Sequence, residues 1–181
     1  NNELLSGDLD LSDFPKEGYL APETYFYEKG EKRIDLLKRI QKAQSKKIIN
    51  VWGKRTKNNI LNSTHELVIL ASIIEKESGN YDELDLISSV LHNRLRKKMR
   101  LQADPTVIFG ITMGKSNLDR ALTKSDLRKY SDYNTYTING IPPNPICNPG
   151  EAALTAAANP LNSKFYYYVS NSKGGHFFSM N

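Results

Sequence analysis

At the centre of the sequence lies Leu67-Val68-Ile69-Leu70-Ala71-Ser72-Ile73-Ile74-Glu75-Lys76-Glu77-Ser78, an apolar run that ends in charged residues. Ser63 and Glu66, just before it, have the spacing of a capping box, which marks the start of a helix. Gly79 follows it and is a natural residue for a helix end. We therefore expect a helix over about 64–78. Because this helix is unusually apolar, we expect it in the middle of the fold.

The two acids near the end of this helix occupy different faces. At about 100° per residue, Glu77 lies about 20° from Leu70, within the apolar stripe, whereas Glu75 lies about 140° away. A carboxyl group set against apolar side chains has a raised pKa, because its charged form is disfavoured. Such a group can deliver a proton near neutral pH, as cleavage of a glycosidic bond requires. The alternative is that Glu77 bends out to solvent or pairs with Lys76 or Arg94.

Outside this helix, the periodicity predicts further helices and a few short strands. The expected helices cover about 31–54, 81–98, 104–110 and 117–129, with a last short helix that begins at 148–151, has Pro149 in its first position and ends before Pro160. The expected strands are Tyr25-Phe26-Tyr27 and a hairpin formed by 165–169 and 176–178 across Asn171–Gly175. The predicted fold class is α+β, with central helices and short strands or hairpins at the edges.

Composition excludes several classes of protein. The chain has 181 residues, 39% of them apolar, and no run approaches the about 18 to 20 apolar residues that span a bilayer. Its single cysteine, Cys147, excludes an internal disulfide framework, and none of the three histidines has metal-ligand spacing, so neither a metal site nor a cofactor is proposed. Residues 29–58 carry eleven Lys or Arg against two acids. No nucleic-acid-binding motif accompanies this charge, so nucleic acid is not expected as a partner.

Several motifs, in one order and spacing, resemble a known family. Leu70–Ser78 is similar to the catalytic helix of YceG-like (MltG-type) endolytic murein transglycosylases. The resemblance continues through segments that lie on both sides of this helix: Glu17–Tyr25, Val90–Leu95, Met99–Val107, Tyr133–Tyr136, Gly140–Pro143 and Gly174-Gly175-His176. Several motifs in one register are far more specific than any single one, so the family assignment covers the chain from about residue 17 to its end.

The resemblance implies a lyase that cuts the β-1,4 bond between N-acetylmuramic acid and N-acetylglucosamine inside peptidoglycan strands. Such an enzyme uses no water and leaves a 1,6-anhydro-muramoyl end. One acid then suffices, because it protonates the leaving oxygen and afterwards takes the proton of the attacking C6 hydroxyl. We assign this role to Glu77, which lies on the apolar face and is followed by Ser78 in a pair similar to that of other lytic transglycosylases. Glu75 is the reserve candidate for the same role.

The other familial motifs supply candidate substrate-binding groups. They are Glu75, Ser78, Gln102, Asp104, Tyr133, Asn134, Tyr136 and Asn144. Gln102 and Asp104 offer an amide and a carboxylate for sugar hydroxyls, or Asp104 caps a short helix instead. The rings of Tyr133 and Tyr136 could stack on sugars, or lie buried at a strand edge. His176 either lines the cleft or serves only the turn that contains it.

The resemblance also implies a wider context. Residues 1–16 are expected to be the remnant of a LysM-like subdomain or linker, and 17–181 the catalytic domain. Since the sequence does not begin with Met, we expect a piece of a longer protein with a single-pass anchor in the bacterial cytoplasmic membrane and this domain on the extracytoplasmic side. Expected partners are peptidoglycan strands and cell-wall synthesis enzymes. A peptidoglycan-binding or scaffolding module without catalysis is the competing hypothesis.

Overall fold

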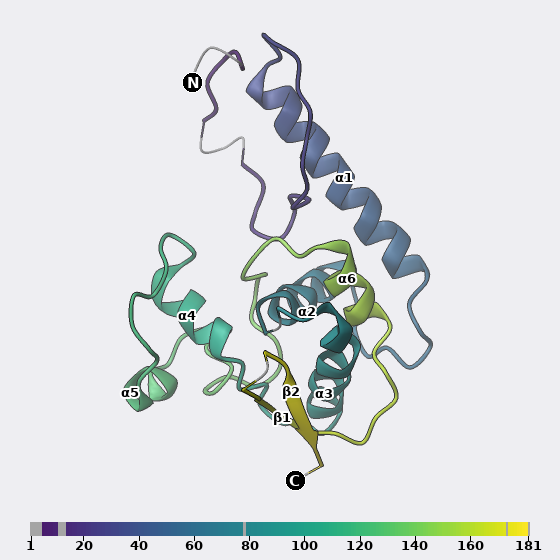
Figure 1. The fold of residues 1–181 in the computed structure, drawn as a ribbon, viewed down its shortest axis with the longest axis vertical. Coiled ribbons are helices and arrows are strands. Elements are labelled where there is room, and N and C mark those ends of the chain that lie inside the picture. The colour runs from purple at the N-terminus through teal and green to yellow at the C-terminus, as the bar shows by residue number, and fades with distance from the viewer. Residues whose placement is uncertain (1–4, 11–13, 78, 173, 181) are drawn as a thin grey trace.

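The computed structural model describes residues 5–10, 14–77, 79–172 and 174–180. Their elements, in chain order, are α1 (Arg33–Gly53), α2 (Thr64–Glu77), the 3-10 helix η2 (Tyr81–Glu83), α3 (Leu84–Arg96), α4 (Asp104–Thr112), α5 (Lys124–Arg128), α6 (Glu151–Ala158), β1 (Tyr167–Ser170) and β2 (His176–Ser179). Helices fill the centre and a two-stranded hairpin lies at one edge (Figure 1). The α+β fold class predicted from the sequence is confirmed.

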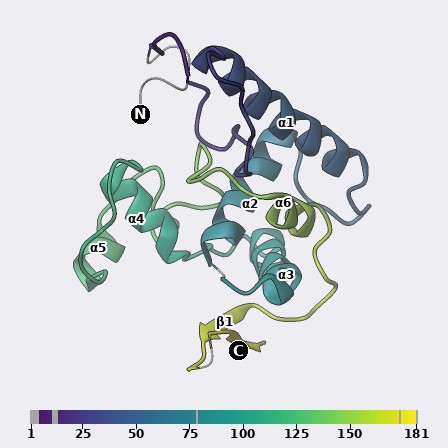
Figure 2. The same ribbon diagram turned by 45° about the horizontal axis from the view of Figure 1, so that its top comes forward.

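Helix α2 is the centre of the hydrophobic core. Every residue from Leu67 to Ile74 is buried, and the helix packs against α1, α3, α4 and α6. Figure 2 shows α2 and α6 side by side with α3 beneath them. Each fully buried Leu or Ile contributes about 1.5–3 kcal/mol, so this helix supplies much of the stability of the fold. One of the two hydrogen bonds of the expected capping box is present at its start: the Glu66 N–H donates to the Ser63 hydroxyl at 3.1 Å.

Helix α6 can approach α2 closely because its inner face is made of small residues. Ala153, Ala156 and Ala157 are at most 1% exposed. The helix begins two residues later than expected, at Glu151, with Gly150 as its N-cap. Pro149 therefore precedes the helix and is not its first residue, which corrects the sequence-based prediction. Its carbonyl is used instead as an acceptor for the side chain of Gln44.

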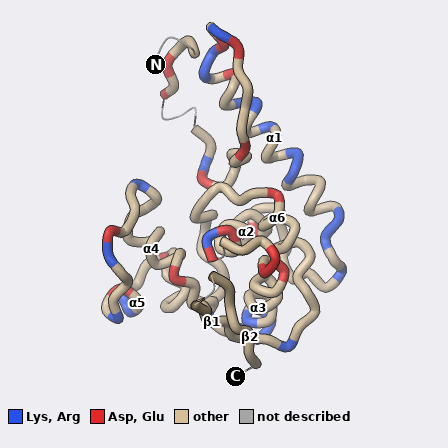
Figure 3. Tube along the Cα trace, in the orientation of Figure 1, with Lys and Arg blue, Asp and Glu red and all other residues tan. Residues whose placement is uncertain are grey.

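Helix α1 lies along one side of the molecule and carries a basic outer face (Figure 3). Its exposed cations include Lys38, Arg39, Lys42 and Lys46. On the inner face, the fully buried Gln44 donates to the carbonyls of Gly18 and Pro149, at 3.2 and 2.9 Å. One amide thus joins α1 to the N-terminal segment and to the chain entering α6. Among the described residues, no helix combines the length and the hydropathy that crossing a bilayer requires.

The N-terminal segment packs against the body at Gly18. This residue has a φ of +95°, and a Cβ there would lie 2.6 Å from the Pro145 ring and 2.8 Å from Val68. Only glycine allows both the backbone conformation and the close approach. Further along, the expected strand at Tyr25–Tyr27 is wrong. This stretch has no regular structure, because no strand among the described residues pairs with its backbone, and the Phe26 side chain is 90% exposed.

The hairpin at the other end is confirmed. Strands β1 and β2 pair antiparallel, with Tyr167 opposite Ser179 and Ser170 opposite His176. The side chains along each strand alternate between the two faces, so Tyr168 and Phe178 face the core while Tyr167 and Phe177 are exposed. This alternation places Tyr168 and His176, the first residue of β2, on the inner side of the hairpin.

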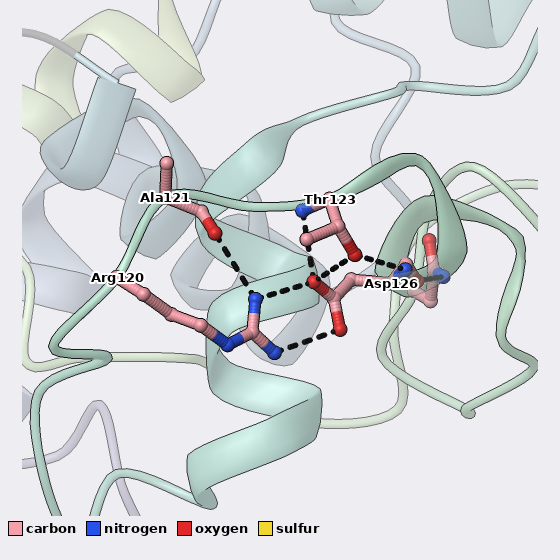
Figure 4. Close-up of polar contacts among 5 residues, drawn as sticks. Arg120, Ala121, Thr123 and Asp126 are labelled. Atoms are coloured by element: carbon pink, nitrogen blue, oxygen red, sulfur yellow. Dashed lines mark hydrogen bonds and ion pairs between the residues drawn. The ribbon is translucent and has the colours of Figure 1, made fainter.

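Helices α4 and α5 form a separate lobe beside α2, and a polar network fixes the shorter helix (Figure 4). Asp126 accepts hydrogen bonds from Arg120 at 2.6 and 3.0 Å and from the Thr123 hydroxyl at 2.7 Å. The Arg120 hydrogen bonds and the Thr123 donors hold the pKa of Asp126 well below its usual range. The helix expected over 117–129 is thereby limited to Lys124–Arg128, since the capping box of Thr123 and Asp126 sets its start.

Candidate active site

Glu77, the last residue of α2, reaches a cavity of about 450 Å³ between the hairpin and α4. The polar groups of its wall are Lys76, Glu77, Arg94, Gln102, Asp104, Tyr136, Tyr168, Ser170 and His176. They come from α2, α3, the start of α4, the loop that follows α5 and both strands. Segments separated by almost a hundred residues therefore meet around one carboxyl group.

One oxygen of the Glu77 carboxyl group is enclosed by protein, while the residue as a whole is half-buried in the cavity wall. Its Oε1 atom is buried and has no hydrogen-bond partner among the described residues. The Tyr168 hydroxyl, on the inner face of β1, donates a hydrogen bond to the carboxylate. Burial raises the pKa of Glu77 to about 7, and the nearby charge of Asp104 adds to the rise, against the opposing effect of Tyr168, His176 and Arg94. This carboxyl group can hold a proton at neutral pH and give it up there.

Arg94 braces the cavity and does not pair with Glu77. Its side chain is buried, and its Nε and Nη1 groups donate to the carbonyls of Tyr166 and Leu101 at 2.6 and 2.7 Å. Those carbonyls belong to the chain entering β1 and the chain entering α4, so one guanidinium joins two walls. No ion pair within 4.0 Å connects Glu77 with Arg94 or Lys76 in the part of the chain that the structure describes. The alternative of a Glu77 paired with Arg94 or Lys76 is therefore not observed, and the buried Oε1 shows that the carboxyl group does not bend fully out to solvent.

Two of the predicted binding residues meet across the cavity. The Tyr136 hydroxyl donates to Asp104 Oδ1 at 2.5 Å. Asp104 is the first residue of α4 and makes no cap for that helix, whose N-cap is Ala103. Gln102 is exposed at the same rim, and its backbone N–H donates to the Thr135 carbonyl at 3.1 Å. An amide, a carboxylate and a phenol thus surround the space in front of Glu77, which suits a ligand rich in hydroxyl groups.

The sequence profile of the YceG-like family matches residues 3–181. The chain belongs to this family. A relative from Bacillus subtilis (strain 168), named endolytic murein transglycosylase, is 36% identical over 160 residues, which are 88% of this chain and 43% of that protein. A relative with the same name from Streptococcus pneumoniae serotype 2 (strain D39 / NCTC 7466) is 27% identical, over 91% of this chain and 30% of its own length.

A solved structure shows the same fold. The crystal structure of a yceG-like protein, lmo1499, from Listeria monocytogenes matches with a TM-score of 0.78 and 36% identity, over 91% of this chain and 52% of that one. The chain thus spans less than half the length of these two transglycosylase relatives and about half of the solved structure.

Three other predicted residues of this YceG-like chain, Tyr133, Asn134 and Asn144, are not part of the Glu77 cavity wall. Asn134 is buried, its amide donates to three carbonyls at the end of α5, and its Oδ1 accepts from the Tyr136 N–H at 2.9 Å. The Tyr133 ring packs on Phe109, with 4.8 Å between centroids. Asn144 lines a different pocket and donates to the Tyr133 hydroxyl at 3.4 Å. Ser78 lies outside the described residues. The predicted roles of these side chains in substrate binding remain predictions.

Glu75 has a partner of its own, at the start of α6. Its Oε2 accepts a hydrogen bond from the Gly150 N–H at 3.0 Å, and Gly150 is the N-cap of that helix. A carboxylate at a helix N-terminus is stabilising, because the N–H groups there carry partial positive charge. Glu75 is not part of the Glu77 cavity wall.

We expect Glu75→Gln to change stability and leave the chemistry of this YceG-like domain in place. The amide oxygen can still accept from Gly150, but the charge is lost, so the free energy of unfolding should fall by about 0.5–1 kcal/mol. Urea denaturation measures that change, and digestion of peptidoglycan should proceed within about three-fold of the unsubstituted rate. A loss of cleavage as large as that of a Glu77 variant would instead make Glu75 the acid.

Two groups were not identified as site residues from the sequence: Tyr168, in the cavity wall, and Glu83, which contacts the cavity residue His176. Tyr168 lies within the aromatic run Phe165–Val169. The sequence of this run does not show which rings face the core, because that depends on the alternation of side chains along the strand. Glu83 lies in η2 and bonds His176, 93 residues later. The sequence analysis left open whether His176 lines the cleft or only forms part of its turn. In the structure it does both, since it lines the cavity and its backbone N–H donates to Glu83. No group of three or more His, Cys, Asp or Glu residues in the described ranges could hold a metal ion.

Proposed function

We propose that this chain is the catalytic part of an endolytic peptidoglycan lytic transglycosylase. It would cleave the β-1,4 bond between N-acetylmuramic acid and N-acetylglucosamine within glycan strands and leave 1,6-anhydro-muramoyl ends. The observation that carries the proposal is the partly enclosed Glu77 carboxyl group, whose pKa is raised to about 7 by burial. The names of its relatives, endolytic murein transglycosylases, support the substrate class.

In the proposed reaction Glu77 acts first as acid and then as base. Protonated Glu77 gives its proton to the glycosidic oxygen while the bond from that oxygen to the anomeric carbon breaks. The C6 hydroxyl oxygen of the same muramoyl residue then bonds to the anomeric carbon, and the Glu77 carboxylate takes the hydroxyl proton. Glu77 ends protonated, as it began, and no water is consumed. The Tyr168 hydroxyl supports the carboxylate between the two steps by its hydrogen bond.

The alternative chemistry for such a site is hydrolysis, which needs a second carboxylate to activate water or to attack the sugar. Asp104 is the other carboxylate of the cavity wall, and its Oδ1 already accepts from Tyr136. This contact favours a binding role for Asp104 and the single-carboxylate reaction for Glu77.

The proposed substrate places the domain on the cell-wall side of the bacterial cytoplasmic membrane. Glycan strands of peptidoglycan would be its main partner. The membrane anchor and the contact with cell-wall synthesis enzymes, both implied by the family resemblance, remain predictions for the full-length protein.

The mass of the products tests the proposal. Nascent, un-crosslinked peptidoglycan is incubated with the protein, and the new termini are analysed by mass spectrometry. We expect ends lighter by one water, about 18 Da, than those produced by a hydrolase. Ends of hydrolysed mass would show that water attacks and would overturn the transglycosylase assignment. Binding of strands without any cleavage would favour the binding-module hypothesis.

A further inference from the structure

The hairpin is attached to the 3-10 helix η2, at the start of α3, by one carboxylate. Glu83 Oε1 accepts from the backbone N–H of His176 at 3.1 Å, and Glu83 Oε2 lies 2.8 Å from the ring Nδ1 of His176. The two side chains are 17% and 9% exposed. Gly175, which is buried beside them, makes this approach possible, since a Cβ there would lie 2.5 Å from Glu83 Oε1. The contact therefore depends on the glycine in the turn as well as on the side chains of Glu83 and His176.

This contact determines which nitrogen of His176 carries the proton. The hydrogen bond with the His176 side chain lowers the pKa of Glu83 below its ordinary value, so Glu83 is ionised at neutral pH. An ionised carboxylate only accepts hydrogen bonds, so Nδ1 must be the donor. In the neutral form of the ring the lone pair then lies on Nε2, and it is in this form that Nε2 is an acceptor.

The ring with this fixed proton belongs to the cavity of Glu77. His176 is part of the cavity wall, and its ring stands edge-on to Tyr168, with centroids 5.3 Å apart and planes at 84°. Tyr168 in turn bonds the Glu77 carboxylate. In the described part of the chain, Nε2 of His176 has no hydrogen-bond partner, whereas Nδ1 is taken by Glu83. A fixed acceptor nitrogen is thus available beside the proposed acid.

We infer that His176 is a substrate-binding residue whose Nε2 accepts a hydrogen bond from a sugar hydroxyl next to the scissile bond. Glu83 is the positioning residue, which orients the ring and holds the hairpin over Glu77. The inference rests on the proposed function, since it requires a glycan in this cavity.

Two substitutions of His176 separate the substrate contact from the attachment of the hairpin. The amide nitrogen of Asn can replace Nδ1 and keep the bond to Glu83, but Asn has no atom at the place of Nε2. We therefore expect His176→Asn to melt near the temperature of the parent protein and to bind glycan roughly ten-fold more weakly. His176→Ala should lose both the attachment and the affinity.

Affinity is measured in a Glu77→Gln background, with un-crosslinked glycan strands as the probe, so that binding does not depend on cleavage. Unchanged affinity of His176→Asn would overturn the inference and leave the proposed function standing. No glycan binding by the Glu77→Gln parent would overturn the inference, while product masses from the unsubstituted protein would decide the proposed function separately.

The role of Glu83 has its own readout, the tautomer of His176. Nitrogen-15 NMR of the ring in the free protein should show the Nδ1–H form. In Glu83→Gln the new amide offers one acceptor oxygen to two donors, so this change should shift the ring toward the Nε2–H form and weaken glycan binding roughly ten-fold. Asp82→Asn, the neighbouring change on the same 3-10 helix, is the matched control and should alter neither. An Nε2–H ring in the parent protein, or unchanged affinity in Glu83→Gln, would contradict the inference.

Discussion

Glu77→Gln is expected to reduce strand cleavage at least about a thousand-fold, because the amide can neither give the first proton nor take the second. Gln has nearly the same volume and can still accept the hydrogen bond of Tyr168, so the cavity should keep its shape. Glycan affinity should therefore change much less than the turnover rate. Cleavage is followed by the appearance of anhydro ends, and Glu75→Gln, the same change two residues earlier on α2, is the control.

The pH profile of the unsubstituted protein should report the same group. The free protein must carry a proton on Glu77, and the pKa of that carboxyl group is about 7. Consequently kcat/KM should fall above pH 7, by about ten-fold for each further pH unit. Activity in Glu77→Gln equal to that of the parent, or a profile with no decline between pH 7 and 9, would exclude Glu77 as the acid.

The same substitution is expected to stabilise the protein at alkaline pH. The pKa of Glu77 is about 7 in the folded state against 4.5 for an ordinary Glu, so between these values the folded protein holds a proton that the unfolded chain has lost. The free energy of unfolding therefore decreases as pH rises from 4.5 to 7 and changes little from this source above 7. The difference between these two pKa values corresponds to a loss of about 3 kcal/mol in the free energy of unfolding.

Gln is uncharged at every pH, so Glu77→Gln should match the parent protein near pH 4.5 and exceed its stability by up to about 3 kcal/mol at pH 8. Urea denaturation at the two pH values measures the difference. A difference in the free energy of unfolding that is the same at both pH values would show that Glu77 is not buried with a raised pKa. Loss of cleavage together with a gain in stability in Glu77→Gln would show that Glu77 serves the chemistry and lowers the stability of the protein.

The sequence predicted the helix that carries Glu77 and the contrast between the two acids, although the structural cause is different. The wheel argument assumed one apolar stripe on α2, whereas residues 67–74 are buried on all faces. What distinguishes the acids is the partner that each one meets. Glu75 meets Gly150 at the start of α6, and Glu77 meets Tyr168 on the hairpin. Both partners come from distant parts of the chain, so local periodicity could not identify them.

Periodicity and motif spacing could not identify the residues whose polar groups form hydrogen bonds within the protein and are not free to bind a ligand. Asn134 lies one residue from Tyr133 and two from Tyr136, and all three have the appearance of a sugar-binding motif. In the structure the Asn134 amide ends α5, while Tyr136 alone of the three reaches the cavity. The Asn134 amide is used up by carbonyls at the end of the short helix before it, whose start is set by Asp126 and Thr123.

The attachment of the hairpin has a consequence for when the acid can work. A hairpin of two four-residue strands has little stability of its own in water. Here it is held by Glu83 at one end and by Arg94, through the Tyr166 carbonyl, at the other. Local unfolding that detached it would let water reach Glu77 and return its pKa to the ordinary range. We therefore expect a molecule whose hairpin opens to lose this proton at neutral pH while the helical core stays folded.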